Sequence, residues 1–140
     1  MLKMPKFEIR ESITIQKTVT EEDTAVNYGN PELERFFATP SLVALMIEAS
    51  TKLIDDKLDE GLITIGKEIH VTHEKPTMIG QTLTIRVTVK DRIENTLKLE
   101  MEAFDELGPI GKGYFDRVIV NKRALLRKAH ARELLLESRF

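Results

Sequence analysis

The 140-residue sequence contains no cysteine. This absence excludes disulfides, zinc–thiolate sites and a cysteine nucleophile, and it fits a reducing compartment. The formal net charge is only −2, so no bulk attraction to nucleic acid is expected. No apolar run approaches the length that crosses a membrane, and Met1–Glu8 lack the continuous apolar segment of a signal peptide. The sequence therefore predicts a soluble, cytoplasmic protein whose partners are neither nucleic acid nor membrane.

The chain is most simply one domain, residues 1–140, because this length suffices for a single buried core. Alternating apolar and polar residues predict strands, and apolar residues at helical spacing predict helices. The expected strands are Ile13–Val19, Leu62–Glu74, Leu83–Val89, Leu97–Ala103 and Ile110–Asn121, and the expected helices are Pro40–Lys57 and Lys122–Glu137. A polar loop, Thr20–Glu34, precedes the first helix and could act as a lid beside its start.

This order of elements favours an α+β hotdog fold, an antiparallel sheet wrapped around one long helix with an additional C-terminal helix. The sheet must bury its apolar face, and Pro40–Lys57 is the one large candidate to cover it. The sheet edges would remain exposed, and the helix is more apolar than one small sheet can cover. A homodimer, or a higher homo-oligomer, that joins two sheets edge to edge resolves both problems.

The stretch Phe37–Glu48 has the pattern of a buried helix with a hydroxyl at its start. Thr39 is a residue type that caps helices, and Pro40 suits the first helical position. The N–H groups at such a helix start can hold a carbonyl oxygen or an anion. Thr39 could serve as a cap alone, or it could also direct its hydroxyl at a substrate, and both roles are compatible.

The stretch Gly66–His73 predicts a strand that carries two histidines. Uninterrupted alternation places His73 on the face of Ile65, Lys67, Ile69 and Val71, toward the helix, and places His70 on the opposite, solvated face. His73 is then either a satisfied structural residue or, if it meets Thr39, a general base that activates water.

These two stretches, followed by Pro76 and Gly80, resemble the fluoroacetyl-CoA thioesterase-like family of hotdog thioesterases. The resemblance extends from about Phe36 to Val120. It implies hydrolysis of a small acyl-CoA thioester by a dimeric enzyme without a metal or redox cofactor, coenzyme A being part of the substrate. It also implies that Thr39 and His73 are catalytic and that Gly66 lies close to the thioester.

Two positions depart from the family pattern. Ile47 stands where the family usually has a glutamate, and Glu48 follows one place later. One position rotates a side chain by about 100° around a helix, so Glu48 can replace that carboxylate only through a shift, a bulge or another direction of approach. Phe115 stands where relatives often carry a histidine, two residues before Arg117.

Each of the remaining candidate site residues has both a structural and a functional interpretation. Glu48 is a solvated carboxylate or a group that orients His73 across the dimer. Gly66 relieves crowding in its strand, or it lets a backbone N–H approach the thioester oxygen. Arg117 forms a structural ion pair, or it binds a coenzyme A phosphate or a carboxylate of the partner subunit. The basic residues of the last helix, Lys122, Arg123, Arg127, Lys128 and Arg132, solvate it or contact a coenzyme A phosphate.

Three functions are compatible with these residues, and they are given in order of decreasing support from the sequence. The first is an acyl-CoA thioesterase that uses Thr39, His73 and Glu48, with Gly66 and Arg117 binding substrate. The second is a hotdog protein that binds acyl-CoA or another small ligand without turnover, and Ile47 is the residue that favours it. The third, an acyl-CoA hydratase or dehydratase, would want an aspartate–histidine pair that the sequence does not contain.

Overall fold

The computed structural model describes residues 10–139. The segment Met1–Glu8, for which the sequence predicts no signal peptide, lies outside the described residues. The strands are β1 (Ser12–Thr18), β2 (Leu62–His73), β3 (Thr82–Ile93), β4 (Thr96–Asp105) and β5 (Gly108–Asn121), and the helices are α1 (Thr39–Ile54) and α2 (Lys122–Glu137). Short 3₁₀ helices lie at Glu21–Asp23, Ala25–Tyr28 and Asp55–Lys57. All of the expected strands and both expected helices are confirmed.

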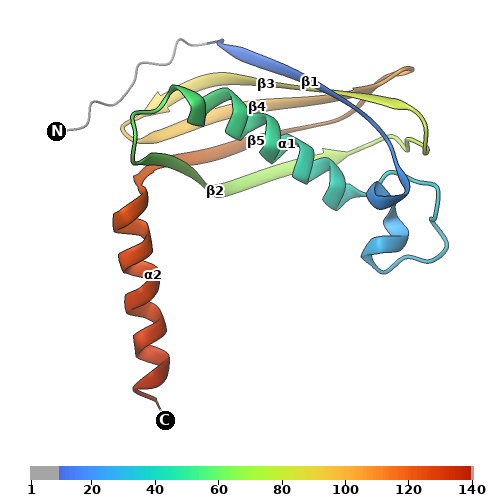
Figure 1. The fold of residues 1–140 in the computed structure, drawn as a ribbon. Coiled ribbons are helices and arrows are strands. Elements are labelled where there is room, and N and C mark those ends of the chain that lie inside the picture. The colour runs from blue at the N-terminus through green and yellow to red at the C-terminus, as the bar shows by residue number, and fades with distance from the viewer. Residues whose placement is uncertain (1–9, 140) are drawn as a thin grey trace.

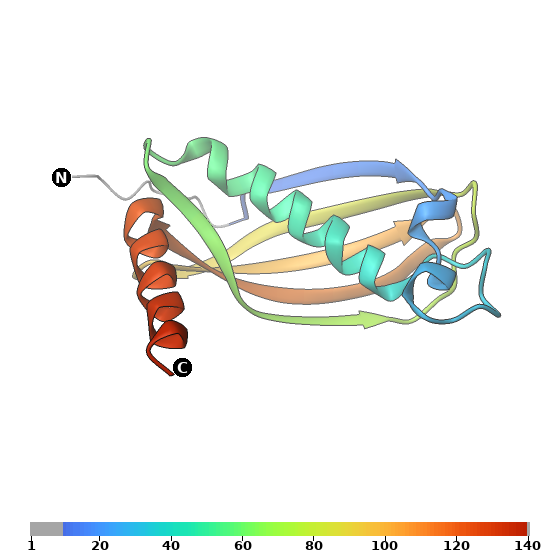
Figure 2. The ribbon, with the colours of Figure 1, turned by 60° about the horizontal axis from the view of Figure 1, so that its bottom comes forward.

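The five strands form one antiparallel sheet in the order β1-β3-β4-β5-β2. Figures 1 and 2 show α1 lying along one face of this sheet, while α2 projects from one end of it. Since β1 and β2 occupy the two edges, each has one side without a strand partner in the described part of the chain. The α+β hotdog arrangement is therefore confirmed, with β2 as a twelve-residue edge strand.

The core lies between α1 and the sheet. One helix face buries Leu42, Met46, Ala49 and Leu53, and the apolar face of the sheet packs against it. The alternation in the sequence identified these sheet residues, all of them nearly inaccessible: Leu83, Ile85, Val87, Val89, Leu97, Leu99, Met101 and Ala103. The helix is thus held along the sheet by apolar burial, which fixes where its N-terminus lies.

A β-bulge in β2 changes which residues face the helix. The pairing with β5 shifts between Gly66 and Glu68, so Lys67 is the extra residue. Beyond the bulge, the prediction is confirmed: His73 lies on the helix face and His70 on the outer face, opposite Tyr114. Before the bulge, the prediction is wrong. Ile65 lies on the outer face and Gly66 on the helix face, because an inserted residue inverts the alternation.

No helix among residues 10–139 is long and apolar enough to span a membrane. Within the same residues, no group of three or more histidine, aspartate or glutamate side chains is arranged to hold a metal ion.

Candidate active site

Thr39 and His73 meet where the first turn of α1 approaches the end of β2. The hydroxyl oxygen of Thr39 lies 2.8 Å from Nδ1 of His73. α1 runs antiparallel to β2, so the N-terminus of the helix and the C-terminus of the strand come to the same end of the molecule (Figure 2). Packing of α1 on the sheet therefore joins two side chains that are distant in the sequence.

The expectation that Thr39 caps α1 is wrong. Ala38 occupies the N-cap position and has no side chain that can accept a hydrogen bond, while Thr39 and Pro40 begin the helix. The N–H of Ala38 donates instead to the carbonyl of Asp23, at 2.8 Å. The hydroxyl of Thr39 is consequently not engaged with the helix backbone and bonds to His73.

His73 is half-buried and keeps one ring nitrogen without a partner. No described group hydrogen-bonds its Nε2, which is shielded from solvent in the single chain. The ring of Phe37 contacts the imidazole edge-on, with ring centroids 6.0 Å apart. Burial lowers the pKa of His73 below its usual 6.5, and a hydrogen bond with the backbone of Lys75 opposes this shift. The imidazole is accordingly predominantly neutral at pH 7, and its buried Nε2 has no hydrogen-bond partner among the described residues.

Residues 20–38, here called the lid segment, form one wall of a cavity of about 280 Å³ at this contact. Thr39, His73 and the turn after β2 form the rest of it. Of the lid segment, the cavity is lined by Ala25, Leu33, Phe36, Phe37 and Ala38. The predicted polar loop, Thr20–Glu34, therefore lies beside the start of α1 and contributes Ala25 and Leu33 to the cavity, while its action as a lid stays a prediction.

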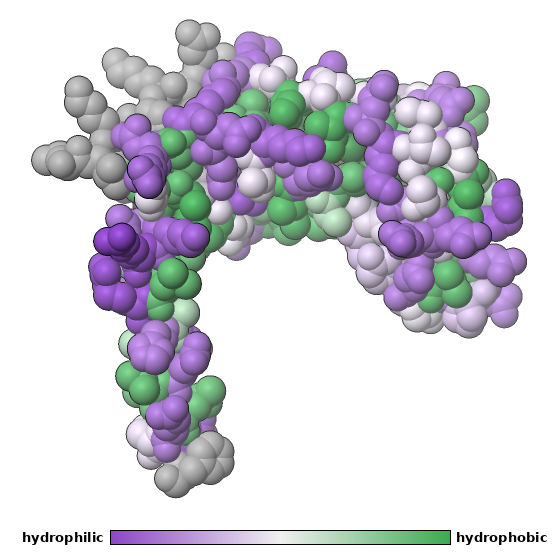
Figure 3. Space-filling view, viewed as in Figure 1, coloured by the Kyte–Doolittle hydropathy of each residue, from purple (hydrophilic) through white to green (hydrophobic). Residues whose placement is uncertain are grey.

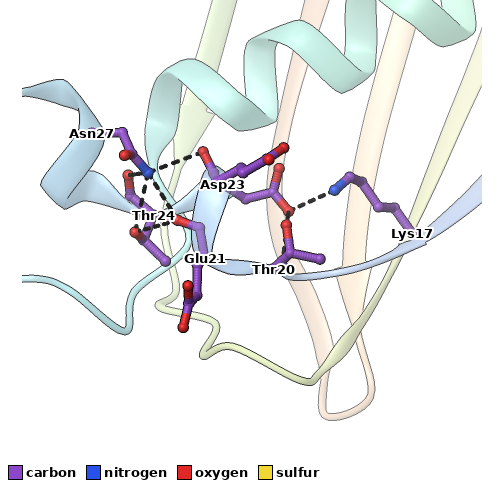
Figure 4. A network of polar contacts seen from close by, with 7 residues as sticks. Lys17, Thr20, Glu21, Asp23, Thr24 and Asn27 are labelled. Atoms are coloured by element: carbon purple, nitrogen blue, oxygen red, sulfur yellow. Dashed lines mark hydrogen bonds and ion pairs between the residues drawn. The ribbon is translucent and has the colours of Figure 1, made fainter.

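Side-chain hydrogen bonds fold the lid segment (Figure 4). Asp23 accepts hydrogen bonds from the N–H of Thr20 at 2.9 Å and from Lys17 at 2.6 Å. Burial alone would raise the pKa of Asp23, but the bonds from Lys17 and Thr20 outweigh burial and lower it below 3.8. The side-chain amide of Asn27 donates to the carbonyl of Glu21 at 2.8 Å. The lid segment is thus an ordered structure anchored to β1.

Glu48 does not join Thr39 and His73 within one chain. It lies about 13 Å further along the axis of α1 than Thr39, given 1.5 Å per residue. Its carboxylate is half-exposed and contacts the ammonium of Lys52 at 3.4 Å. The adjacent Ile47 is also exposed, at 37%. Any contact of Glu48 with a His73 would therefore have to come from another chain.

Gly66 and Arg117 also lie away from His73 within the chain. Gly66 is seven residues before His73 in β2, and Arg117 of β5 pairs with Gly66. A Cβ at Gly66 would stand 3.0 Å from the ring of Phe115, so the glycine makes room for this aromatic side chain. The Arg117 guanidinium lies over the same ring, 5.1 Å from its centroid. Both candidate substrate-binding residues are thus held in one cluster around Phe115.

Two residues that the sequence analysis missed hold Arg117 in place. Arg117 is 5% exposed, and its Nε and Nη2 donate to the hydroxyl and carbonyl of Thr64 at 2.9 and 3.0 Å. The Thr64 hydroxyl in turn donates to Asp55. Burial lowers the pKa of Arg117, and the charge of Asp55 opposes this. No signal in the sequence pointed to Thr64, because uninterrupted alternation places it on the outer face with His70, and only the bulge brings it to the helix face.

A larger hollow, of about 880 Å³, lies on the outer face of the sheet, opposite α1. His70 and Tyr114 stack there with ring centroids 5.0 Å apart. Ion pairs cross its floor, such as Lys98 with Asp116 at 2.9 Å. No described hydroxyl hydrogen-bonds to the imidazole of His70 on this surface, whereas the hydroxyl of Thr39 hydrogen-bonds to His73, so we assign the chemistry to the smaller cavity at Thr39.

Comparisons with known proteins point to one family. Residues 19–123 match the profile of the fluoroacetyl-CoA-specific thioesterase family. A fluoroacetyl-CoA thioesterase of Streptantibioticus cattleyicolor is 30% identical over 95 residues, which cover 66% of this chain and 68% of that protein.

Solved structures show the same architecture. A hot-dog-like protein of Thermanaerovibrio acidaminovorans is 29% identical, with a TM-score of 0.85, covering 90% of this chain and 93% of that one. A thioesterase-superfamily protein of Thermus thermophilus is 26% identical, with a TM-score of 0.83, covering 94% and 99%. On the strength of the profile match and the shared fold, the chain belongs to the fluoroacetyl-CoA-specific thioesterase family of hotdog thioester hydrolases.

Proposed function

We propose that this chain hydrolyses small acyl-CoA thioesters at the cavity where Thr39 meets His73. The observation that carries the residue assignment is the 2.8 Å contact between the Thr39 hydroxyl and Nδ1 of His73. This contact leaves Nε2 of a neutral imidazole free to accept a proton. Family membership supports thioester hydrolysis over the second candidate, a protein that binds acyl-CoA without turnover.

In the proposed reaction, His73 acts as the general base. Nδ1 carries the ring proton and donates it to the Thr39 oxygen, so that Nε2 accepts a proton from water as the water oxygen attacks the thioester carbonyl. The N–H groups at the start of α1 stabilise the negative charge that develops on the carbonyl oxygen. The carbon–sulfur bond then breaks, and the proton passes to the sulfur. The products are the free acid and coenzyme A, with no metal or redox cofactor.

The size and lining of the cavity favour a short acyl group. Its volume of about 280 Å³ lies at the lower end of what small-molecule sites offer. The side chains of Leu33, Phe36 and Phe37 give it an apolar wall. An acyl group of a few carbons fits such a space.

The proposal includes a homodimer joined through β2. This strand leaves one edge unpaired, and Ile69 on it and Ile47 on α1 are each 37% exposed. Long strand edges of this kind template pairing with another chain. Antiparallel pairing of two copies of β2 around a two-fold axis places the early part of one strand beside the late part of the other. Gly66 and Arg117 of one subunit would then approach His73 of its partner.

Glu48 belongs to the proposal only across this interface. Its exposed position beside Ile47 puts it on the α1 surface that a second copy would cover. There it would orient the imidazole of a partner chain, in place of the family's glutamate one position earlier. The proposal also places the protein in the cytoplasm, because the sequence contains no cysteine.

The decisive experiment is hydrolysis of a panel of acyl-CoA thioesters, followed by release of free thiol. His73→Ala should lower kcat by roughly 100- to 10,000-fold, as expected for loss of a general base. His70→Ala is the matched control, since this histidine lies on the same strand but faces outward. Equal activity of the two variants would disprove the role of His73.

The Ile47→Glu variant separates hydrolysis from binding. A wild-type protein that binds acyl-CoA but does not hydrolyse it, and that gains hydrolysis on Ile47→Glu, would establish the non-catalytic alternative. Hydrolysis by the wild type that His73→Ala abolishes establishes the enzyme.

A further inference from the structure

Helix α2 has no covering surface in the single chain. It projects from one end of the fold beyond β2 (Figures 1 and 2), and no residue of this fully described helix is buried. Four of its five leucines are exposed by about half or more: Leu126 by 57%, Leu134 by 49%, Leu135 by 64% and Leu136 by 57%. An isolated helix of 16 residues is marginal in water, so contact with another surface would stabilise it.

The charge of α2 is complementary to that of the lid segment. The helix carries five basic residues and two glutamates, whereas residues 20–38 carry five acidic residues and one arginine. The basic side chains are Lys122, Arg123, Arg127, Lys128 and Arg132, and the exposed acidic side chains are Glu21, Glu22, Glu32 and Glu34. Within residues 10–139, none of these nine side chains has an ion-pair partner. Both surfaces therefore have unused charge of opposite sign.

The lid segment also offers apolar contact area. Val26 is 41% exposed and Tyr28 is 54% exposed, both in the second 3₁₀ helix of the segment. Opposite charges around exposed apolar side chains are the composition of a specific interface.

The two surfaces lie at opposite ends of one molecule and cannot meet within it. Figures 1 and 2 show α2 at the end of the sheet where β5 finishes, and the lid segment at the other end. Both project to the same side of the molecule, and the space-filling view shows a hollow between them with apolar side chains at its roof (Figure 3). The two surfaces can therefore meet only between two copies of the chain.

Strand polarity determines which parts of that copy would meet. The N–H of Lys122 donates to the carbonyl of Gly61 at 2.9 Å, which fixes the start of α2 beside the start of β2. The lid segment lies at the end of β2, with His73. Antiparallel pairing of two β2 strands sets the start of one against the end of the other. α2 of each chain is thereby directed at the lid segment of its partner.

We propose that α2 docks on the lid segment of the partner subunit and holds it over the partner's cavity. The inference rests on the proposed β2-paired homodimer and adds a second contact to it. Because the lid segment lines the cavity with Ala25, Leu33 and Phe36, each site is complete only when α2 of the other chain supports it.

Cysteine cross-linking tests the contact, since the chain has no cysteine of its own. In Tyr28→Cys/Leu134→Cys, mild oxidation should give a covalent dimer on a non-reducing gel. The control is Tyr28→Cys/Ile93→Cys: Ile93 is 53% exposed and ends β3, at the same end of the sheet as α2. Equal cross-linking of both pairs would overturn the proposal, as would cross-linking of Leu134→Cys alone, which would show that α2 pairs with another α2.

A charge exchange tests the consequence for the site. Arg127→Glu/Lys128→Glu should raise KM for acyl-CoA about three- to tenfold, the effect of losing two partly exposed ion pairs. Adding Glu21→Lys/Glu22→Lys should restore KM, while Lys112→Glu on the outer sheet face should leave it unchanged. Failure of the exchange to restore KM would overturn the docking of α2.

Sedimentation of the same variants separates the docking of α2 from the β2-paired homodimer on which it rests. A dimer that hydrolyses acyl-CoA but shows no selective cross-link retains the proposed function and rejects the α2 contact. A monomer rejects both.

Discussion

The hydroxyl of Thr39 lies 2.8 Å from Nδ1 of His73, although 34 positions separate the two residues in the chain. The contact exists because Ala38, and not Thr39, occupies the N-cap of α1. A threonine at the cap would direct its oxygen at the helix backbone. One position later, the same residue type is released from that role and can hold the imidazole.

Thr39→Ala should therefore affect activity more than stability. Loss of one hydrogen bond to His73 is worth about 1 kcal/mol, so kcat/KM should fall about three- to tenfold. The free energy of unfolding should change by less than the roughly 1 kcal/mol that loss of a helix cap costs. Steady-state kinetics and urea unfolding measure the two quantities.

Thr39→Ser is the matched control, because it keeps the hydroxyl and should retain near-wild-type kcat/KM. A Thr39→Ala variant that is clearly destabilised yet fully active would show that the hydroxyl has only a structural role.

The activity should depend on pH through His73. Burial lowers its pKa below 6.5, and a general base must be neutral to accept a proton. We expect kcat/KM to rise with pH through a midpoint below 6.5 and to be level at pH 7. His70→Ala should leave this profile unchanged, and a midpoint above 6.5 would contradict the assigned environment of His73.

The lowered pKa of His73 should also make the free energy of unfolding depend on pH. Because the folded protein holds the His73 proton more weakly than the unfolded chain does, protonation favours unfolding. The contribution vanishes only well above pH 6.5, where the histidine is neutral in both the folded and the unfolded protein, and stability should decline as pH falls through 6.5 and then through the lowered pKa. His73→Asn should decline less over this interval, as measured by urea unfolding at a series of pH values.

The sequence predicted the parts of the fold that depend on local pattern. Leu83 and Val87 alternate with polar residues, and this period alone assigns β3 and its buried face. The bulge at Lys67 could not be predicted in this way, because the shift is defined by pairing with β5. An uninterrupted alternation therefore placed Ile65 on the wrong face while placing His73 correctly.

The sequence predicted the proximity of Thr39 and His73 but not the contacts that hold Arg117. Thr39 and His73 stand in recognisable stretches, so their proximity followed once the fold was assigned. The support of Arg117 by Thr64 and Asp55 depends on three separate elements meeting in the core, and no local pattern joins these residues. Glu48 remains a prediction, since any partner other than Lys52 would lie in a second chain.

Gly111 should be required at the site and Gly113 only for the fold. A Cβ at either glycine would overlap a backbone carbonyl of β2, of Thr72 or of His70 respectively. Replacement by alanine should cost roughly 1–3 kcal/mol of unfolding free energy in both cases, while Lys112→Ala between them should cost less than about 0.5 kcal/mol.

Activity should distinguish the two glycines. The Cβ of Gly111→Ala would also lie 3.5 Å from Cα of His73, so the displaced strand carries the imidazole with it. At a temperature where both alanine variants are folded, we expect a lower kcat/KM for Gly111→Ala than for Gly113→Ala. Equal values would show that displacement of β2 is not transmitted to His73.

Asp23→Asn should loosen the lid segment and raise KM. The carboxylate accepts hydrogen bonds from Lys17 and Thr20, and the carbonyl of the same residue holds the N–H of Ala38 at the start of α1. Loss of the charge should cost about 1 kcal/mol at pH 7, a value between those of charged hydrogen bonds and exposed ion pairs. KM for acyl-CoA should rise, because the lid segment lines the cavity.

The pH dependence of this effect has a defined sign. The pKa of Asp23 is lowered below 3.8 in the folded protein, so its contribution is fully present above that pH and is lost as pH falls through the lowered value. The difference in unfolding free energy between wild type and Asp23→Asn should therefore shrink toward zero at low pH. Lys17→Met, which removes the other charge of the pair, should show the same convergence. A difference that persists at low pH would assign the effect to packing of the lid segment and not to the charge of Asp23.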